Sequence, residues 1–132
     1  MAKGLMDFVM EAKSQIKEIS ADDLLDMQDG GTDMLVVDVR EPGEFIHGHI
    51  KHAMLVPRGI LEAAADIQYP KSNETLREAR DRSIVVYCAT GGRSAMAAKT
   101  LQDMGFSQVY SLAGGFSAWE QAGKPIFREG EY

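Results

Sequence analysis

The sequence predicts an α/β domain built around an open parallel sheet. Apolar stretches of strand length alternate with segments of helical spacing, which is the pattern of β-α units. The run Met34–Val37 is continuously apolar, as expected for a strand that is covered on both faces. The segment 83–99 passes from a strand into a helix through a glycine-rich turn. In sheets of this kind, ligands bind beyond the carboxyl ends of the strands.

The composition of the 132-residue chain is that of one ordinary globular domain, with 45% hydrophobic and 26% charged residues. A formal charge of −6 argues against nucleic acid or an anionic membrane as a partner, since both attract a basic surface. A single cysteine cannot form an internal disulfide, which is typical of a reducing compartment. No apolar run has the length of a membrane span, and no signal peptide is recognisable. We therefore expect a cytoplasmic protein.

The first segments of the chain predict a helix, a strand and a second helix. From Leu5 to Ile16, apolar residues recur at helical spacing and predict an amphipathic helix. Its apolar face either packs on the domain or binds a partner. The segment Ile16–Ile19 predicts a short edge strand. Ser20 is the expected N-cap of the next helix, which ends at Gly30.

Charged residues follow the apolar strand that begins at Met34. Asp38 stands at its end, and a proline-glycine turn leads into a short helix at Glu44–His47. The next predicted strand, Met54–Val56, is followed by Arg58. Because the carboxyl ends of parallel strands lie at one edge of the sheet, Asp38 and Arg58 are expected near the edge that carries the single cysteine. The remaining predicted elements are helices at Gly59–Ile67, Glu74–Arg80, Ser94–Gly105 and from Phe116, and strands at Ser83–Tyr87 and Gln108–Leu112.

The histidines His47, His49 and His52 are close together in the sequence. Their spacing matches no familiar zinc pattern, and the single cysteine lies elsewhere. A histidine in a turn more often forms hydrogen bonds with the backbone. We therefore expect no metal site and no cofactor.

The single cysteine, Cys88, lies where a predicted strand ends and faces the N-terminus of the following helix. Unpaired helix N–H groups and the cation of Arg93 both stabilise a thiolate and lower the pKa of the thiol. Gly91 and Gly92 allow the backbone to curl so that several N–H groups converge on one point. The loop therefore predicts a reactive sulfur that receives an anion. The alternative is a glycine-rich turn with an inert buried cysteine.

Five sequence blocks, taken in order, resemble the rhodanese-like domain family, and specifically the single-domain sulfurtransferases. The resemblance covers residues 16–126, implies a single rhodanese-like domain and leaves 1–15 as an N-terminal helical extension. Residues 127–132 would form a short C-terminal tail, which we expect to fray. The family fold implied is a five-stranded parallel sheet with helices on both faces. The blocks are Asp38–Phe45, Gly48–Ile50, Val56–Pro57, Val85–Ser94, and Leu112–Phe116 with Trp119.

The resemblance also implies a site in which Cys88 is the catalytic residue and forms a persulfide. Asp38 and Arg40 match the family's aspartate and arginine after the second strand, and they would support the loop structurally together with Ser94. Substrate binding would involve Ala89, Thr90, Gly91, Gly92, Arg93 and Arg58.

The expected activity is that of a thiosulfate:cyanide sulfurtransferase-like enzyme. The Cys88 thiolate would accept a sulfane sulfur from thiosulfate or a persulfide and pass it to a thiol or cyanide. Since the chain has no second cysteine, the sulfur must leave to another molecule, either a small acceptor or an acceptor protein. Ala89 and Thr90 are neutral where related proteins that prefer thiosulfate often carry a further cation, which argues against efficient use of thiosulfate.

Two other functions fit the same loop. One is a sulfur-carrying or regulatory binding module with little turnover of its own. The other is a cysteine-dependent phosphatase or arsenate reductase. Related phosphatases of the cell-cycle type have five residues between cysteine and arginine, whereas this chain has four, Ala89–Gly92. The shorter loop favours a sulfane sulfur over a tetrahedral phosphate.

Overall fold

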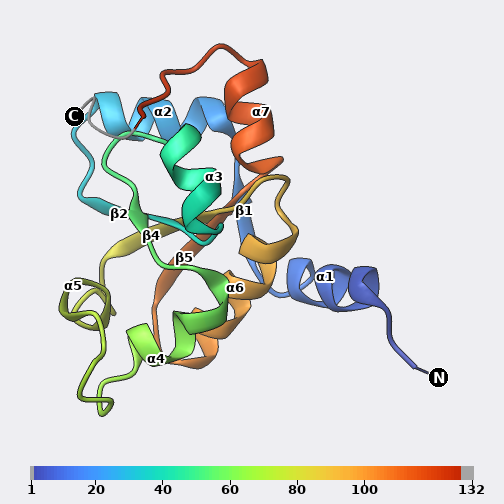
Figure 1. Ribbon diagram of the computed structural model, residues 1–132, viewed down its shortest axis with the longest axis vertical. Coiled ribbons are helices and arrows are strands. Elements are labelled where there is room, and N and C mark those ends of the chain that lie inside the picture. The colour runs from blue at the N-terminus through green and yellow to red at the C-terminus, as the bar shows by residue number, and fades with distance from the viewer. Residues whose placement is uncertain (1, 129–132) are drawn as a thin grey trace.

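The computed structural model describes residues 2–128 and contains a five-stranded, all-parallel sheet. The strand order is β1-β5-β4-β2-β3, so β4 lies in the middle of the sheet. Figure 1 shows this sheet between its covering helices. The predicted fold class is confirmed. The strands are β1 Lys17–Ile19, β2 Met34–Asp38, β3 Met54–Leu55, β4 Ser83–Tyr87 and β5 Gln108–Leu112.

Alternate residues of the central strand β4 face two different layers of helices. Ile84 and Val86 belong to one hydrophobic core, which α4 and α6 cover. Val85 and Tyr87 belong to the other, which contains Trp119 and is covered by α2 and α7 (Figure 1). This is the pattern expected when a strand is buried on both faces. The helices are α2 Ala21–Asp29, α3 Pro42–His47, α4 Leu61–Ala65, α5 Glu74–Arg77, α6 Gly92–Asp103 and α7 Gly115–Gln121, with a 3-10 turn at Arg58–Ile60.

Strands β2 and β4 end at the same level of the sheet. Asp38 lies opposite Tyr87 in the register, so the residues after both strands meet at one edge. The helix that follows β4 begins earlier than predicted, at Gly92 rather than Ser94. Gly91 is its N-cap and has a φ of 107°, a left-handed conformation that glycine adopts readily. The loop after Cys88 is therefore shorter than the sequence indicates.

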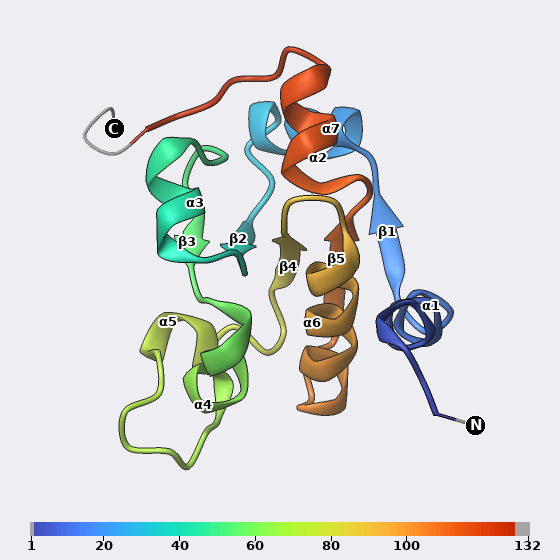
Figure 2. The ribbon, with the colours of Figure 1, turned by 45° about the vertical axis from the view of Figure 1, so that its right-hand side comes forward.

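The N-terminal helix α1, Leu5–Lys13, packs against α6. It buries Val9 and Ala12. Figure 2 shows α1 beside the lower end of β1. Its other large apolar side chains, among them Leu5 and Met6, remain exposed to solvent. Thus the helix packs on the domain along a narrow stripe, while its larger apolar side chains are about half or more exposed.

The C-terminal segment is held to the domain beyond the predicted boundary at residue 126. Phe127 forms an antiparallel bridge with His49, in which each backbone N–H donates to the other residue's carbonyl at 2.8 and 2.9 Å. The Trp119 indole N–H donates to the Pro125 carbonyl at 2.8 Å and directs the chain toward this bridge. The prediction that the tail frays is therefore wrong for Phe127, and residues 129–132 lie outside the described part of the chain.

Between residues 2 and 128, none of the helices combines the length and apolar character needed to cross a membrane.

Candidate active site

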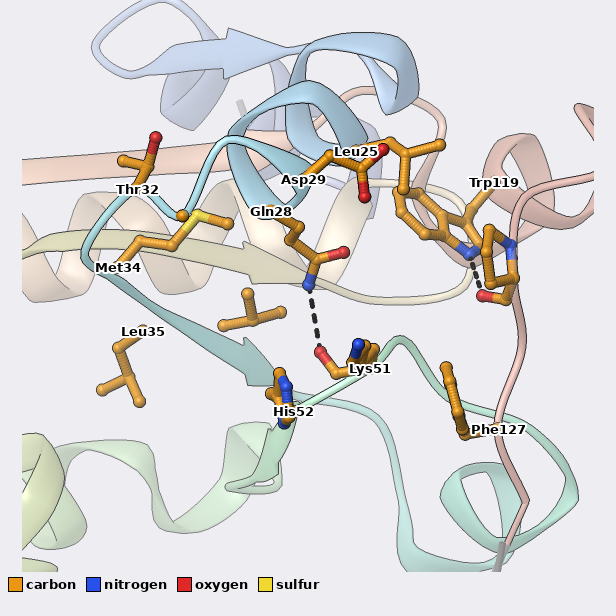
Figure 3. A pocket seen from close by; sticks show the side chains of 13 residues that line it. Leu25, Gln28, Asp29, Thr32, Met34, Leu35, Lys51, His52, Trp119 and Phe127 are labelled. Atoms are coloured by element: carbon orange, nitrogen blue, oxygen red, sulfur yellow. Dashed lines mark hydrogen bonds between the residues drawn. The ribbon is translucent and has the colours of Figure 1, made fainter. Parts of the chain in front are cut away.

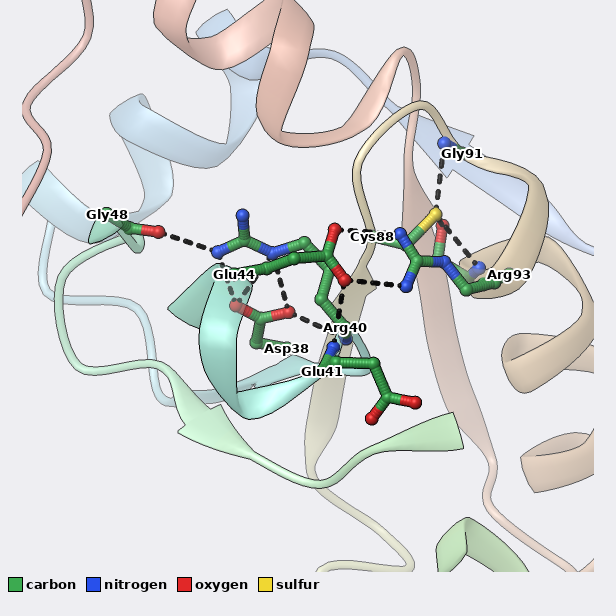
Figure 4. Close-up of polar contacts among 9 residues, drawn as sticks. Asp38, Arg40, Glu41, Glu44, Gly48, Cys88, Gly91 and Arg93 are labelled. Carbon is green, nitrogen blue, oxygen red and sulfur yellow. Dashed lines mark hydrogen bonds and ion pairs between the residues drawn. The ribbon is translucent and has the colours of Figure 1, made fainter. Parts of the chain in front are cut away.

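Cys88 lies directly after β4, and its sulfur is surrounded by hydrogen-bond donors. The backbone N–H of Gly91 donates to Sγ at 3.1 Å and that of Ser94 at 3.3 Å (Figure 4). The Ser94 hydroxyl oxygen lies 3.5 Å from the same sulfur. All these donors belong to the loop and the first turn of α6, so the helix N-terminus points at the sulfur.

This environment favours the thiolate form of Cys88. Burial raises the pKa of the thiol, but the hydrogen bonds from the Ser94 side chain and from the backbone of Ser94, Gly91 and Thr90 outweigh it. The pKa of Cys88 is therefore lowered from its ordinary value. A larger fraction of Cys88 is then ionised at neutral pH than in a free thiol.

Ser111 on β5 completes the polar surroundings of the sulfur, although the sequence analysis did not single it out. Its hydroxyl lies 2.8 Å from that of Ser94, and both side chains are buried. When the Ser94 hydroxyl oxygen accepts a hydrogen bond from the Ser111 hydroxyl, the hydrogen of Ser94 is free to donate to the Cys88 sulfur. The signal available in the sequence was a polar residue at a buried position of an otherwise apolar strand.

We predict that Ser94→Ala shifts the ionisation of Cys88 to higher pH, because the thiolate loses the hydroxyl donor. Alkylation of Cys88 by iodoacetamide, followed against pH, reports the thiolate fraction. The midpoint should lie below that of a free thiol in the wild type and should move upward in the variant. At pH 7 the alkylation rate should fall about tenfold, the effect of losing one hydrogen bond to a charged group. Ser107→Ala is the control, since this exposed hydroxyl contacts only Arg80 and Asp81; identical midpoints in all three proteins would contradict the assignment.

The start of α7 holds the loop backbone in place. The N–H of Phe116 donates to the Cys88 carbonyl at 2.8 Å, and the N–H of Ser117 donates to the Ala89 carbonyl at 2.9 Å. Gly115 is required at this approach, because a Cβ there would lie 2.5 Å from the Cys88 carbonyl oxygen. Gly115 also has a positive φ of 58°. Gly115 is thus part of the site, although it lies 27 positions after Cys88.

Asp38 and Arg40 form a buried ion pair beside the loop. The guanidinium Nε and Nη2 donate to the two carboxylate oxygens at 3.0 and 2.8 Å (Figure 4). Nη2 also donates to the Gly48 carbonyl at 2.7 Å, and the guanidinium carbon lies 4.4 Å from the centre of the Phe116 ring. Burial lowers the pKa of Arg40, but Asp38 more than compensates and raises it. The pair therefore connects β2, the turn after α3 and the start of α7, which in turn holds the Cys88 loop.

Arg93 is paired with Glu44, so its charge is compensated. Its Nη1 and Nη2 donate to the two Glu44 carboxylate oxygens at 2.9 and 3.1 Å (Figure 4). The Arg93 hydrogen bonds lower the pKa of Glu44 to about 2. The cation that the sequence places near Cys88 is thus paired with a carboxylate. Glu44 was predicted only as part of a short helix, because its partner is 49 positions away in the chain.

Arg58 forms its side-chain hydrogen bonds outside the Cys88 loop, and its role in substrate binding stays a prediction. Its guanidinium donates to Glu62 at 3.0 Å and to Thr100 on α6 at 3.1 Å. It lines a separate hollow between α1 and α6 that does not include Cys88. The reason is the strand order: β3 is the edge strand, separated from β4 by β2.

A hollow of about 290 Å³ leads to Cys88. The loop contributes Thr90, Gly92 and Arg93 to its lining, whereas the predicted binding residue Ala89 is not among the lining residues. A larger hollow of about 380 Å³ lies on the α2 side of the sheet, where Gln28 donates to the Lys51 carbonyl near Trp119 (Figure 3). It holds no cysteine. Within residues 2–128, no group of three or more His, Cys, Asp or Glu is arranged to hold a metal ion.

These features define a class of protein: a parallel α/β fold in which the loop from β4 to α6 surrounds a cysteine sulfur with converging backbone N–H groups. A family model described as the rhodanese-like domain matches residues 20–122. The chain belongs to the rhodanese-like domain family. This confirms the family that the five sequence blocks indicate.

Its relatives include single-domain sulfurtransferases. A sulfurtransferase of Allochromatium vinosum is 32% identical over 111 residues, which cover 84% of this chain and 94% of the relative. The thiosulfate sulfurtransferase GlpE of Shewanella oneidensis is 34% identical over 114 residues, covering 83% of this chain and 97% of the relative. A solved structure from Rhodopseudomonas palustris, of a protein of unknown function described as a possible tyrosine phosphatase, is 39% identical, with a TM-score of 0.89 and 96% of each chain covered.

Proposed function

We propose that this protein moves a sulfane sulfur from thiosulfate or a persulfide donor to a thiol or cyanide acceptor through a persulfide on Cys88. The observation that carries the proposal is the pair of backbone N–H groups, from Gly91 and Ser94, that donate to Sγ at 3.1 and 3.3 Å. A persulfide anion on Cys88 would place its charge near the same donors. The sulfurtransferase relatives support this chemistry.

The first half of the reaction is a displacement at sulfur. The Cys88 thiolate attacks the outer sulfur of thiosulfate, and a bond forms between Sγ and that sulfur. The sulfur–sulfur bond of thiosulfate breaks, and sulfite leaves with the electron pair. In the second half, the acceptor attacks the outer sulfur of the persulfide, and Cys88 leaves as the thiolate. No oxidant or reductant is consumed over the cycle.

A second candidate function is phosphate-ester cleavage by the same thiolate. It is favoured by the Rhodopseudomonas palustris relative, which is described as a possible tyrosine phosphatase. Two features argue against it in this chain. The loop has four residues between Cys88 and Arg93, and Arg93 forms a bidentate pair with Glu44 that a phosphate would have to displace.

Intact mass separates these possibilities. The purified protein is incubated with thiosulfate, or with a low-molecular-weight persulfide, and its mass is compared with that of a sample treated afterwards with a reductant. We expect a gain of one sulfur that the reductant removes. A gain that persists for hours in the presence of cyanide and thiols would favour a sulfur-carrying module over an enzyme. No gain with either donor, together with hydrolysis of p-nitrophenyl phosphate, would overturn the proposal in favour of the phosphatase.

A further inference from the structure

The wall of the Cys88 hollow opposite the loop is formed by the N-terminal helix. Leu5, Met6 and Val9 of α1 line the hollow, and Met96 of α6 extends the same surface. The match to the rhodanese-like domain begins only at residue 20, so α1 lies outside the matched segment. The fold therefore brings an added apolar helix face to the place where the outer sulfur of a persulfide would be exchanged.

The charges around the hollow do not favour a small inorganic anion. Two cations line the hollow, and each is paired with a carboxylate. The Arg93 guanidinium lies 2.9 Å from the Glu44 carboxylate, and the Lys13 ammonium lies 4.0 Å from the Glu18 carboxylate. A dianion such as thiosulfate would have to compete with these carboxylates or remain on the loop N–H groups alone. The remaining lining is apolar or neutral. The hollow thus provides little charge and a large apolar surface.

The apolar wall is exposed in the free protein. Leu5 is 68% exposed and Met6 is 61% exposed. A ligand with a hydrocarbon body would remove this surface, and its own, from water, which is favourable at about 25 cal/mol per Å². The flexible, unbranched methionines can adjust to ligands of different shape.

We infer that the acceptor of the Cys88 persulfide is an organic thiol with an apolar carbon body, which α1 binds against Leu5 and Met6. The inference rests on the proposed function. The acceptor thiolate attacks the outer sulfur of the Cys88 persulfide and forms a new sulfur–sulfur bond. The bond to Sγ breaks, its electron pair stays on Cys88, and the organic persulfide departs.

The test uses a series of n-alkyl thiols, which differ in apolar surface but hardly in thiol chemistry. Cys88 is loaded with sulfur, excess donor is removed, and loss of the sulfur is followed by intact mass with ethanethiol, n-butanethiol and n-hexanethiol. Each buried methylene contributes a factor of about 3 to 4. We therefore expect the second-order rate constant to rise about tenfold from ethanethiol to n-butanethiol, where the two added methylenes are mostly buried.

Met6→Ser should reduce this ratio to about threefold or less, because one side of the hydrocarbon would face a hydroxyl. Leu5→Ser is the second variant. Met10→Ser is the matched control, since Met10 is 65% exposed on the same helix but does not line the hollow. A ratio near unity in the wild type, or the same ratio in Met6→Ser, Leu5→Ser and Met10→Ser, would overturn the inference. Failure of the proposed function is distinguishable, because Cys88 would then never gain the sulfur.

Discussion

Cys88→Ser should abolish sulfur transfer while leaving the fold intact. A serine hydroxyl is not ionised at neutral pH, and the four loop N–H and hydroxyl contacts cannot replace the lost nucleophile. We expect the rate of thiocyanate formation from thiosulfate and cyanide to fall by a factor of about 10³ or more, which is typical of removing a catalytic nucleophile. The same variant should gain no sulfur by intact mass.

The stability of this variant makes the result interpretable. Oxygen is smaller than sulfur but fits the same donors, so the free energy of unfolding measured in urea should change by no more than about 1 kcal/mol. Activity retained at a tenth of the wild-type rate would place the chemistry elsewhere in the chain. A loss of activity accompanied by unfolding would be resolved with Cys88→Ala, which introduces no hydroxyl.

Asp38→Ala is expected to give the largest loss of stability. Asp38 is fully buried, Arg40 is 4% exposed, and the two share three side-chain hydrogen bonds. Removing the carboxylate leaves a buried guanidinium without its charge partner, which costs about 3–5 kcal/mol. The midpoint of urea unfolding should fall accordingly.

The matched control is Asp33→Ala. Asp33 pairs with Arg82 at 3.0 Å, but its side chain is 81% exposed, so we expect a change within about 0.5 kcal/mol. Asp38→Asn keeps the shape and one carbonyl acceptor and should fall between the two. If Asp38→Ala and Asp33→Ala unfold at the same urea concentration, the buried pair does not support the fold in the way proposed.

The predicted bounds of secondary-structure elements agree best with the structure where strand-forming residues and turn residues indicate the same boundary. The predicted bounds of β4 and β5 are those of the structure, because short segments rich in β-branched and aromatic residues are bounded by polar or glycine-rich turns. The predicted bounds of the short helices differ more from the structure. The helix predicted at Glu74–Arg80 ends at Arg77, and the helix predicted at Gly59–Ile67 begins with a 3-10 turn. Short helices have few intrahelical hydrogen bonds, so tertiary contacts decide where they end.

The candidate site likewise contains residues from one local segment and residues from distant parts of the chain. Cys88, Gly91 and Ser94 belong to one continuous strand–loop–helix segment, and their arrangement follows from local backbone geometry. Glu44 and Ser111 reach the site from 49 and 17 positions away, through side-chain contacts with loop residues. Arg58 illustrates a limit of local signals, because a position after a strand indicates the edge of the sheet but not which strands are neighbours.

The α/β class, the family and the position of Cys88 at the end of a strand all followed from the sequence. These depend on apolar periodicity, on turn residues and on motifs contained in short segments, and such information is local. Three features became visible only in the tertiary structure. Glu44 pairs with Arg93, and the Cys88 carbonyl lies so close to Gly115 that no side chain fits there. The helix α1 forms a wall of the hollow. Each of these depends on the distance between elements that are far apart in the chain, and strand order and packing set those distances.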